Sequence, residues 1–304
     1  HGTTTINSST AGGLFIGRSN VVAGTFSNEF FGPVNINVTL SGNVNFSESN
    51  STSIHNCIFN DVVTINSSPT STGNVRFGSN DFGSTTFQNN GTLASGVIDG
   101  ATIITLLQIS HTSGLPSVVT CTGLGNIACG NNLAGNLNSF SGDIDFTAPT
   151  ISIRQTTVSG NSIINSTGTT TCGDLAANTP NFFNGTITIN SPTLLLRNNE
   201  INGIANISAQ SFLFQNNIFN GVANMIKTNG ATGNTTNGGN VFNDDVTFTH
   251  NGTGQWSLGS SPAGDDYNGD VTYLRMNSGT LSMASTNTST FAGNISTVGS
   301  SSNP

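Results

Sequence analysis

A seven-residue segment of the chain reads Phe183-Asn184-Gly185-Thr186-Ile187-Thr188-Ile189. An aromatic residue comes first, small turn residues follow it, and apolar and polar residues then alternate. Gly and Asn suit tight turns because they tolerate a positive φ, whereas alternation with a period of two indicates a strand with one buried face. The segment therefore predicts a turn that leads into a β-strand.

The same pattern recurs along the chain. Clear copies begin at Phe31, Phe140, Phe242 and Tyr267, and weaker ones at Phe59, Phe82, Val158, Ile201, Phe219 and Phe291. The anchors at 183, 201, 219, 242, 267 and 291 are separated by 18, 18, 23, 25 and 24 residues. A propeller blade needs about 40 residues. Units of this length instead fit one coil of a parallel β-solenoid, with a second short strand such as Leu194-Leu195-Leu196 inside each unit.

The composition agrees with stacked coils. Only 7% of the 304 residues are charged, the net charge is −8, and 19 residues are Phe. Equivalent residues of successive coils lie about 4.8 Å apart, so stacked charges repel one another, whereas stacked Phe rings fill a core and stacked Asn amides pair. We therefore predict an all-β fold, a parallel β-helix of about twelve coils of roughly 18–25 residues. Residues 1–304 are expected to form one elongated segment of a longer repetitive chain.

Two stretches break the repeat, and we predict that they are loops inserted between coils. They are residues 105–138 and 166–181. With six Lys and Arg residues in all, the chain lacks the basic surface that nucleic acid requires. It also lacks an apolar run of the roughly 20 residues that a transmembrane helix needs.

Several acidic residues are the first candidates for a functional site. Asp245 and Asp270 occupy the same position in neighbouring units. They could act as the carboxylate pair of a retaining glycosidase, share a structural Ca²⁺ with Asp244, Asp265 and Asp266, or simply be solvated turn residues. The last reading is favoured, so no catalytic residue and no cofactor other than this Ca²⁺ is predicted.

Other reactive side chains give weaker signals. Cys121 and Cys129 could close a short loop as a disulfide, which would indicate an oxidising compartment. His55, His111 and His250 lie in unrelated repeat positions and are expected at the surface. Three arginines follow the second strand of a unit, where they either contact an anionic sugar or end the strand in solvent; they are Arg18, Arg154 and Arg197.

The segments Phe183 to Ile189 and Phe242 to Phe248 resemble repeats of very large secreted surface adhesins from gliding and predatory bacteria. This resemblance implies an extracellular, cell-surface fibre, assembled from one or several copies, that attaches to surfaces, glycans or other cells. It implies no catalytic residues. Two alternatives stay open: a β-helix polysaccharide lyase or hydrolase, and an ice-binding solenoid with a flat Thr array.

Overall fold

The computed structural model describes residues 2–9, 11–17, 24–46, 53–78, 87–89, 93–107, 109–130, 137–174, 179–228, 234–235, 238–260 and 263–299. Within these ranges, the side chains of residues 24–26, 53–56, 87–89, 95, 97 and 234–235 are not described. The weak repeat copy at Phe82, the residue Arg18 and the side chain of His55 therefore lie outside the described part of the chain.

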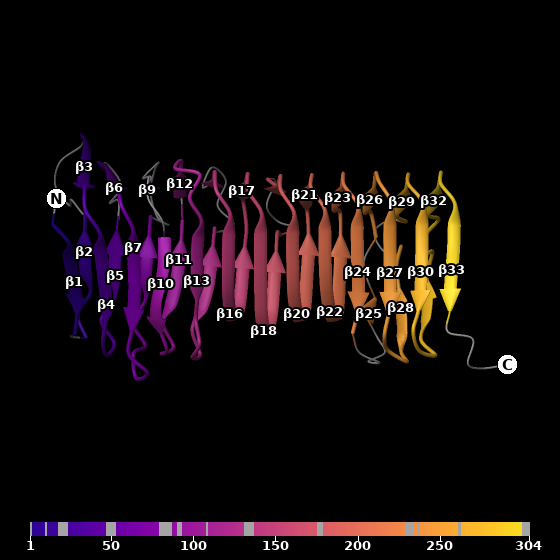
Figure 1. Cartoon of the computed structure of the whole chain (residues 1–304), viewed down its shortest axis with the longest axis horizontal. Helices are drawn as coiled ribbons and strands as arrows, with labels where there is room; N and C mark the ends of the chain where they lie inside the picture. The colour runs from indigo at the N-terminus through magenta and orange to yellow at the C-terminus, as the bar shows by residue number, and fades with distance from the viewer. Residues whose placement is uncertain are drawn as a thin grey trace. The chain divides into compact units, whose positions relative to one another are not determined.

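The described residues form strands and turns and contain no helix. The chain divides into two compact units, an N-terminal unit His1–Asn161 and a C-terminal unit Ser162–Pro304. In each unit every described strand pair is parallel and joins one coil to the next (Figure 1). The predicted all-β parallel solenoid is confirmed, whereas the single domain over residues 1–304 stays a prediction.

Each coil of the N-terminal unit contributes strands to three sets. The first set is β1 (Thr4–Ser8), β4 (Val34–Val38), β7 (Val63–Ser67), β10 (Leu93–Ile98) and β13 (Ser117–Thr120). The second is β2 (Leu14–Ile16), β5 (Val44–Phe46), β8 (Val75–Phe77), β11 (Ile103–Leu106) and β14 (Asn126–Cys129). The long strand β16 (Ile144–Ile153) continues both sets. The third set is β3 (Gly24–Phe30), β6 (Ser53–Phe59), β9 (Phe87–Asn89), β12 (Ile109–His111), β15 (Asn138–Phe140) and β17 (Thr156–Val158).

The C-terminal unit repeats this arrangement. Three long strands span the first two sets: β18 (Ser162–Cys172), β20 (Ile187–Arg197) and β22 (Ala205–Gln215). Later coils divide them into β24 (Ala223–Lys227), β27 (Val246–His250), β30 (Val271–Arg275) and β33 (Ile295–Gly299), and into β25 (Asn234–Thr235), β28 (Gln255–Ser257) and β31 (Thr280–Ser282). The third set is β19 (Asn181–Phe183), β21 (Asn199–Ile201), β23 (Ile218–Phe219), β26 (Val241–Phe242), β29 (Asp266–Tyr267) and β32 (Thr290–Phe291).

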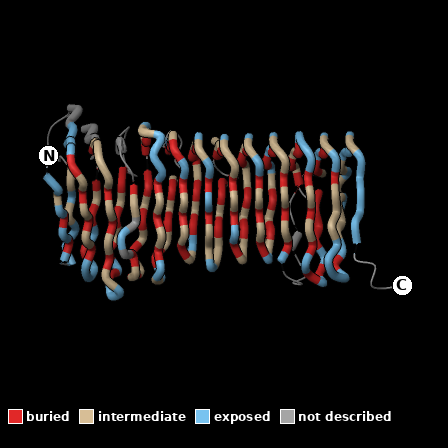
Figure 2. Tube along the Cα trace, viewed as in Figure 1, coloured by how far each residue is buried: buried red, intermediate tan, exposed pale blue. Residues whose placement is uncertain are grey.

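The core is a stack of side chains from every second residue, so buried and less buried positions alternate along the strands (Figure 2). The predicted anchors from 183 to 291 are in register with one another. The rings of Phe219, Phe242, Tyr267 and Phe291 lie 4.7, 5.1 and 4.8 Å apart and are almost parallel. Burying one such ring stabilises the fold by about 2 kcal/mol, and each ring pair adds about 1 kcal/mol.

One anchor was predicted one residue away from its true position. Phe31 is 54% exposed. Phe30, the last residue of β3, occupies the aromatic position instead and stacks on Phe59 at 4.8 Å. Because side chains alternate between the two faces of a strand, neighbouring Phe residues cannot both enter the core.

A buried amide ladder links coils of the C-terminal unit; its members are Asn181, Asn199, Asn217, Asn240 and Asp265. Each Asn side chain donates from Nδ2 to Oδ1 of the next member, at distances of 2.8, 2.8, 2.9 and 2.9 Å. Asp265 ends the ladder because a carboxylate accepts but has no NH₂ group to donate. A second row of hydrogen-bonded amides, the outer amide ladder, lies at the exposed turn: Asn184, Asn202, Asn220, Asn243 and Asn268.

The predicted insertion at 105–138 is wrong. These residues include β12, β13 and β14, and β13 pairs with β10 and β16 while β14 pairs with β11 and β16. The described residues of this stretch belong to ordinary coils, whose inward positions carry unexpected residues. His111 takes the position that Phe140 holds in the next coil. The sequence pattern is therefore lost although the backbone register is kept.

The insertion predicted at 166–181 is also largely wrong. Strand β18 runs to Cys172 and pairs with β20 up to Cys172–Leu196, with one register shift between Asn165 and Thr169. A β-bulge accommodates the extra residue without interrupting the coil. Of the described residues in this stretch, 173–174 and 179–180 lie outside the strands.

Candidate functional site: the outward rows of the solenoid

Outward side chains of the first strand set in the C-terminal unit form a hydroxyl–amide row. Its members, one per coil, are Thr188, Asn206, Asn224, Thr247, Thr272 and Ser296. Asn224 Nδ2 donates to Asn206 Oδ1 at 2.9 Å, and the hydroxyls of Thr272 and Ser296 lie 3.1 Å apart. Strand pairing spaces these groups about 4.8 Å apart along the unit.

A second outward row lies two residues further along each strand. It consists of Asn190, Ser208, Ile226, Thr249, Leu274 and Val298. Neither row contains a charged residue. Together they present a face of hydroxyls, amides and small apolar side chains, all exposed or half-buried.

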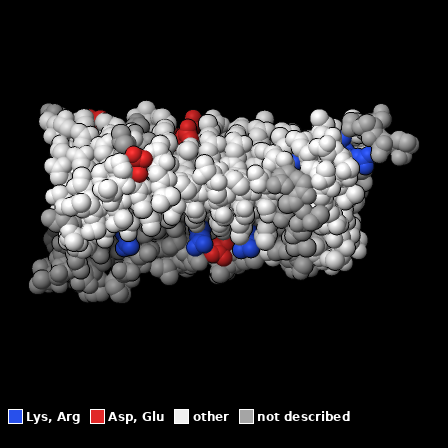
Figure 3. Space-filling view, turned by 90° about the horizontal axis from the view of Figure 1, so that it is seen from below, with Lys and Arg blue, Asp and Glu red and all other residues white. Residues whose placement is uncertain are grey.

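The N-terminal unit has a similar face on its own first strand set. Asn66 Nδ2 donates to Asn37 Oδ1 at 2.9 Å, and Asn37 Nδ2 donates to Asn7 Oδ1 at 2.8 Å. Asp145 also points outward there, and burial raises the pKa of its carboxyl. Charged atoms are few and scattered in the view of Figure 3. The two rows of the C-terminal unit hold no charged residue, so a ligand on that face would meet hydrogen-bonding and apolar groups instead of charges.

The acidic candidates do not form one cluster. Asp245 and Asp270 do occupy the same position in neighbouring coils, as predicted, and Asp245 Oδ1 accepts the backbone N–H of Asp270 at 2.8 Å. Asp270 Oδ1 in turn accepts the N–H of Asn294 at 2.8 Å. These carboxylates therefore satisfy backbone donors of the following coil, which is a structural role.

Two further acidic candidates lie away from that corner. Asp265 is fully buried at the end of the buried amide ladder. Burial raises the pKa of its carboxyl, and this effect exceeds the lowering by the hydrogen bonds from Asn240. Asp266 is exposed and accepts the hydroxyl of Thr290 at 2.6 Å. Within the described residues, no group of three or more acidic, His or Cys side chains could hold a metal ion. The Ca²⁺ prediction gains no support from this arrangement.

The two candidate disulfide cysteines are buried free thiols in the structure. Cys121 follows β13, whereas Cys129 ends β14 and lies 3.5 Å from both Thr156 Oγ1 and Asn138 Nδ2. The two thiols thus belong to different strand sets of one coil. Burial raises the pKa of Cys121 to about 11 and that of Cys129 to about 12.

Two of the histidines are buried, which corrects the expectation of surface positions. His111 is 1% exposed and His250 is 0% exposed. Both occupy inward positions of a strand. Phe140 holds the position of His111 in the following coil, and Lys227 holds the position of His250 in the preceding coil. Arg154 and Arg197 lie where their strands turn, and Nε of Arg197 is buried without a hydrogen-bond partner among the described residues.

The sequence reasoning missed a cationic column, which we define as Lys227, His250 and Arg275. These residues are in register on β24, β27 and β30 and continue the inward position of Ala209. Their separations of 23 and 25 residues equal those of the aromatic anchors in the same coils. That shared spacing was the signal in the sequence, but three different residue types concealed it.

No family model, no curated protein and no solved structure matches this chain. Within the described residues, no helix has the length and apolarity needed to cross a membrane.

Proposed function

We propose that the chain is a structural and adhesive segment of an extracellular bacterial surface fibre, and that its outward rows bind neutral polysaccharide. The observation that carries the proposal is the hydroxyl–amide row, repeated once per coil without a charged residue from Thr188 to Ser296. Hydroxyl and amide groups are the donors and acceptors that match the hydroxyls of neutral sugars.

The spacing of the row supports this choice of ligand. Coils repeat about every 4.8 Å, which is close to the separation of successive sugars in an extended β-linked polysaccharide. Each coil can then offer the same weak contact to the next sugar, and many weak contacts add up through multivalency. The stacked rings and amide ladders hold the row straight within a unit and so reduce the entropy lost on binding.

The test is retention of the full chain on insoluble cellulose and chitin. Thr188→Arg places a long cationic side chain in the row, and we expect at least about tenfold weaker retention, equivalent to roughly 1.4 kcal/mol. The matched control is Leu195→Arg, on the second half of the same strand β20, which also points outward. Leu195→Arg is expected to bind like the unaltered chain.

Three results would count against the proposal. Equal retention of Thr188→Arg and the unaltered chain would remove the row from the binding surface. Release of soluble sugars that is lost in the double variant Asp245→Ala, Asp270→Ala would favour a polysaccharide lyase or hydrolase. Thermal hysteresis without any polysaccharide binding would favour the ice-binding alternative.

A further inference from the structure

The cationic column is unusual because two of its members, Lys227 and His250, are buried in the solenoid, whereas Arg275 at its end is exposed. Lys227 and His250 are both 0% exposed, and Lys227 Nζ donates to the backbone carbonyl of Gln210 at 2.7 Å. Burial lowers the pKa of Lys227, and burial followed by the charge of Lys227 lowers that of His250. Two of the chain's six Lys and Arg residues, Lys227 and Arg275, thus hold the same register position two coils apart, with His250 between them.

No acidic group compensates this charge in the described part of the chain. Within it, no carboxylate is hydrogen-bonded or ion-paired to Arg275. The phenol of Tyr273 lies 3.4 Å from His250 Nδ1 and donates to the carbonyl of Gly279 at 3.2 Å. Nε2 of His250 is buried without a hydrogen-bond partner among the described residues. The exposed guanidinium of Arg275 can therefore pair with an anion from solution.

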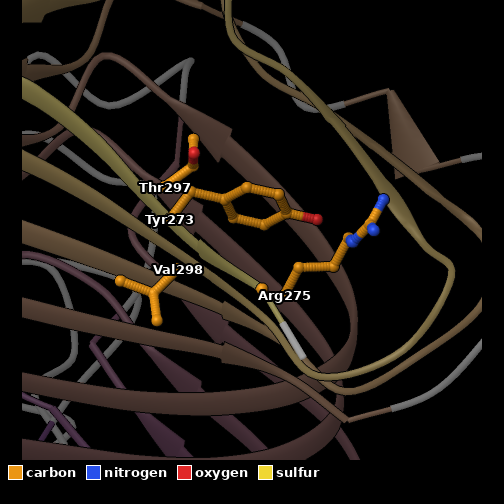
Figure 4. Close-up of a pocket in the computed structure, with 5 residues that line it drawn as sticks. Tyr273, Arg275, Thr297 and Val298 are labelled. Atoms are coloured by element: carbon orange, nitrogen blue, oxygen red, sulfur yellow. The ribbon is translucent and has the colours of Figure 1, made fainter. Parts of the chain in front are cut away.

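A cavity of about 270 Å³ opens beside the last member of the column. It is lined by Tyr273, Arg275, Thr297, Val298 and Gly299. Figure 4 shows the Tyr273 phenol and the Arg275 guanidinium extending to the same side of the strands. Gly299 follows Arg275 in the column, and a Cβ at this position would lie 3.9 Å from Arg275 Nε. This distance is an ordinary contact, so alanine would fit there, whereas a larger side chain at Gly299 would occupy the cavity.

We propose that this cavity binds the carboxylate of a monosaccharide acid, such as a uronic acid. The planar guanidinium of Arg275 offers paired N–H donors that fit a carboxylate, and the ring of Tyr273 provides a flat surface for a sugar. The Thr297 hydroxyl adds a donor and acceptor for a sugar hydroxyl. The volume is close to the lower end of small-molecule sites. The cavity shares Val298 with the second outward row, but the carboxylate contact at Arg275 does not depend on the proposed adhesive function.

The experiment titrates the full chain with glucuronate, with glucose as its neutral analogue and with acetate as the carboxylate alone. Binding is followed by saturation-transfer NMR and calorimetry at low ionic strength, because salt screens an exposed charge pair. Glucuronate is expected to bind at least about tenfold more tightly than glucose. Acetate is expected to bind more weakly than glucuronate and to compete with it, because both place a carboxylate on Arg275.

Two variants test the site in different ways. Arg275→Gln removes the charge and is expected to weaken glucuronate binding at least about tenfold, whereas Arg197→Gln, on β20, serves as the control and should not. Gly299→Val keeps the charge but fills the cavity, and it should also abolish binding. Fluorescence of the buried Trp256 verifies that each variant is folded. Equal binding of glucose and glucuronate, no binding of glucuronate, or full binding by either Arg275→Gln or Gly299→Val would overturn the proposal.

Discussion

Replacing one residue of the buried amide ladder should destabilise the C-terminal unit far more than replacing its exposed counterpart three residues later. Asn217 is 0% exposed, and its Nδ2 donates to Leu196 O at 2.8 Å and to Asn240 Oδ1 at 2.9 Å. Its Oδ1 accepts both the backbone N–H and Nδ2 of Asn199, at 3.2 and 2.8 Å. Asn217→Ala therefore leaves the Asn199 N–H and the Leu196 carbonyl buried without these partners.

The magnitude follows from those two groups. A buried polar group that loses its partner costs about 1–3 kcal/mol, so we expect Asn217→Ala to lower the free energy of unfolding by about 4 kcal/mol. The control is Asn220→Ala in the outer amide ladder. Asn220 donates to Asn202 Oδ1 at 2.6 Å, but it is exposed, and water replaces the lost bond. Its replacement should cost about 0.5 kcal/mol.

Urea denaturation followed by fluorescence measures both variants, because the single Trp of the chain, Trp256, is fully buried in the C-terminal unit. The midpoint should fall strongly for Asn217→Ala and hardly at all for Asn220→Ala, with similar denaturant dependence. Circular dichroism must give coincident transitions for the free energies to be valid. Equal losses for the two variants would refute the claim that burial, and not the hydrogen bond itself, makes the ladder important.

Three further outcomes are expected. Because burial and the charge of Lys227 lower the pKa of folded His250 below its ordinary value of 6.5, the unfolded state binds more protons, so stability should fall as pH drops below about 6.5. The change of stability with pH, at most about 1.4 kcal/mol per pH unit, should disappear in His250→Gln. Thermal unfolding followed by Trp256 fluorescence at several pH values measures it, and an unchanged pH dependence in the variant would contradict the prediction. Cys121 and Cys129 should resist iodoacetamide at pH 8 in the native chain, because burial raises their pKa values to about 11 and about 12. Both should react in denaturant without reductant. Failure to react in denaturant, detected by mass spectrometry, would show that they form a disulfide. Gly78 and Gly114 have φ of +86° and +70°, but only at Gly78 would a Cβ meet a backbone atom, Leu107 O at 1.8 Å. Gly114→Ala should lower the free energy of unfolding by about 1 kcal/mol, and Gly78→Ala should lower it by at least about 2 kcal/mol more. Hydrogen exchange of the backbone amides in residues 53–78 measures the difference. Equal exchange rates in the two variants would rule out the clash at Gly78.

The fold was predictable because a solenoid repeats its chemistry at every coil. The anchors Phe183, Phe219 and Phe242 are visible in the sequence because one inward position selects a large apolar residue in each coil, most often an aromatic one. The corner after the second strand repeats in the same way. Asn198 and Asn216 both have a φ of +53°, which turns the backbone there.

Prediction failed where backbone register is kept by residues that differ in chemistry. His111 in an aromatic position and Cys129 in an inward strand position conceal an ordinary coil, because parallel hydrogen bonding between backbones does not depend on side chains. The cationic column was missed for a related reason. A charged residue is expected in solvent, so Lys227 and His250 gave no hint from the sequence that they face the interior.

The buried amide ladder also has a consequence for the length of the C-terminal unit. Asn181, Asn199 and Asn217 are 18 residues apart and make the same contact in each coil. Deleting residues 199–216 would bring Asn217 into the place of Asn199 and leave the terminal Asp265 unchanged. Loss or duplication of a gene segment that encodes one coil can thus shorten or extend the C-terminal unit by about 4.8 Å. The length of this unit can therefore change by whole coils without disturbing the contacts within the ladder.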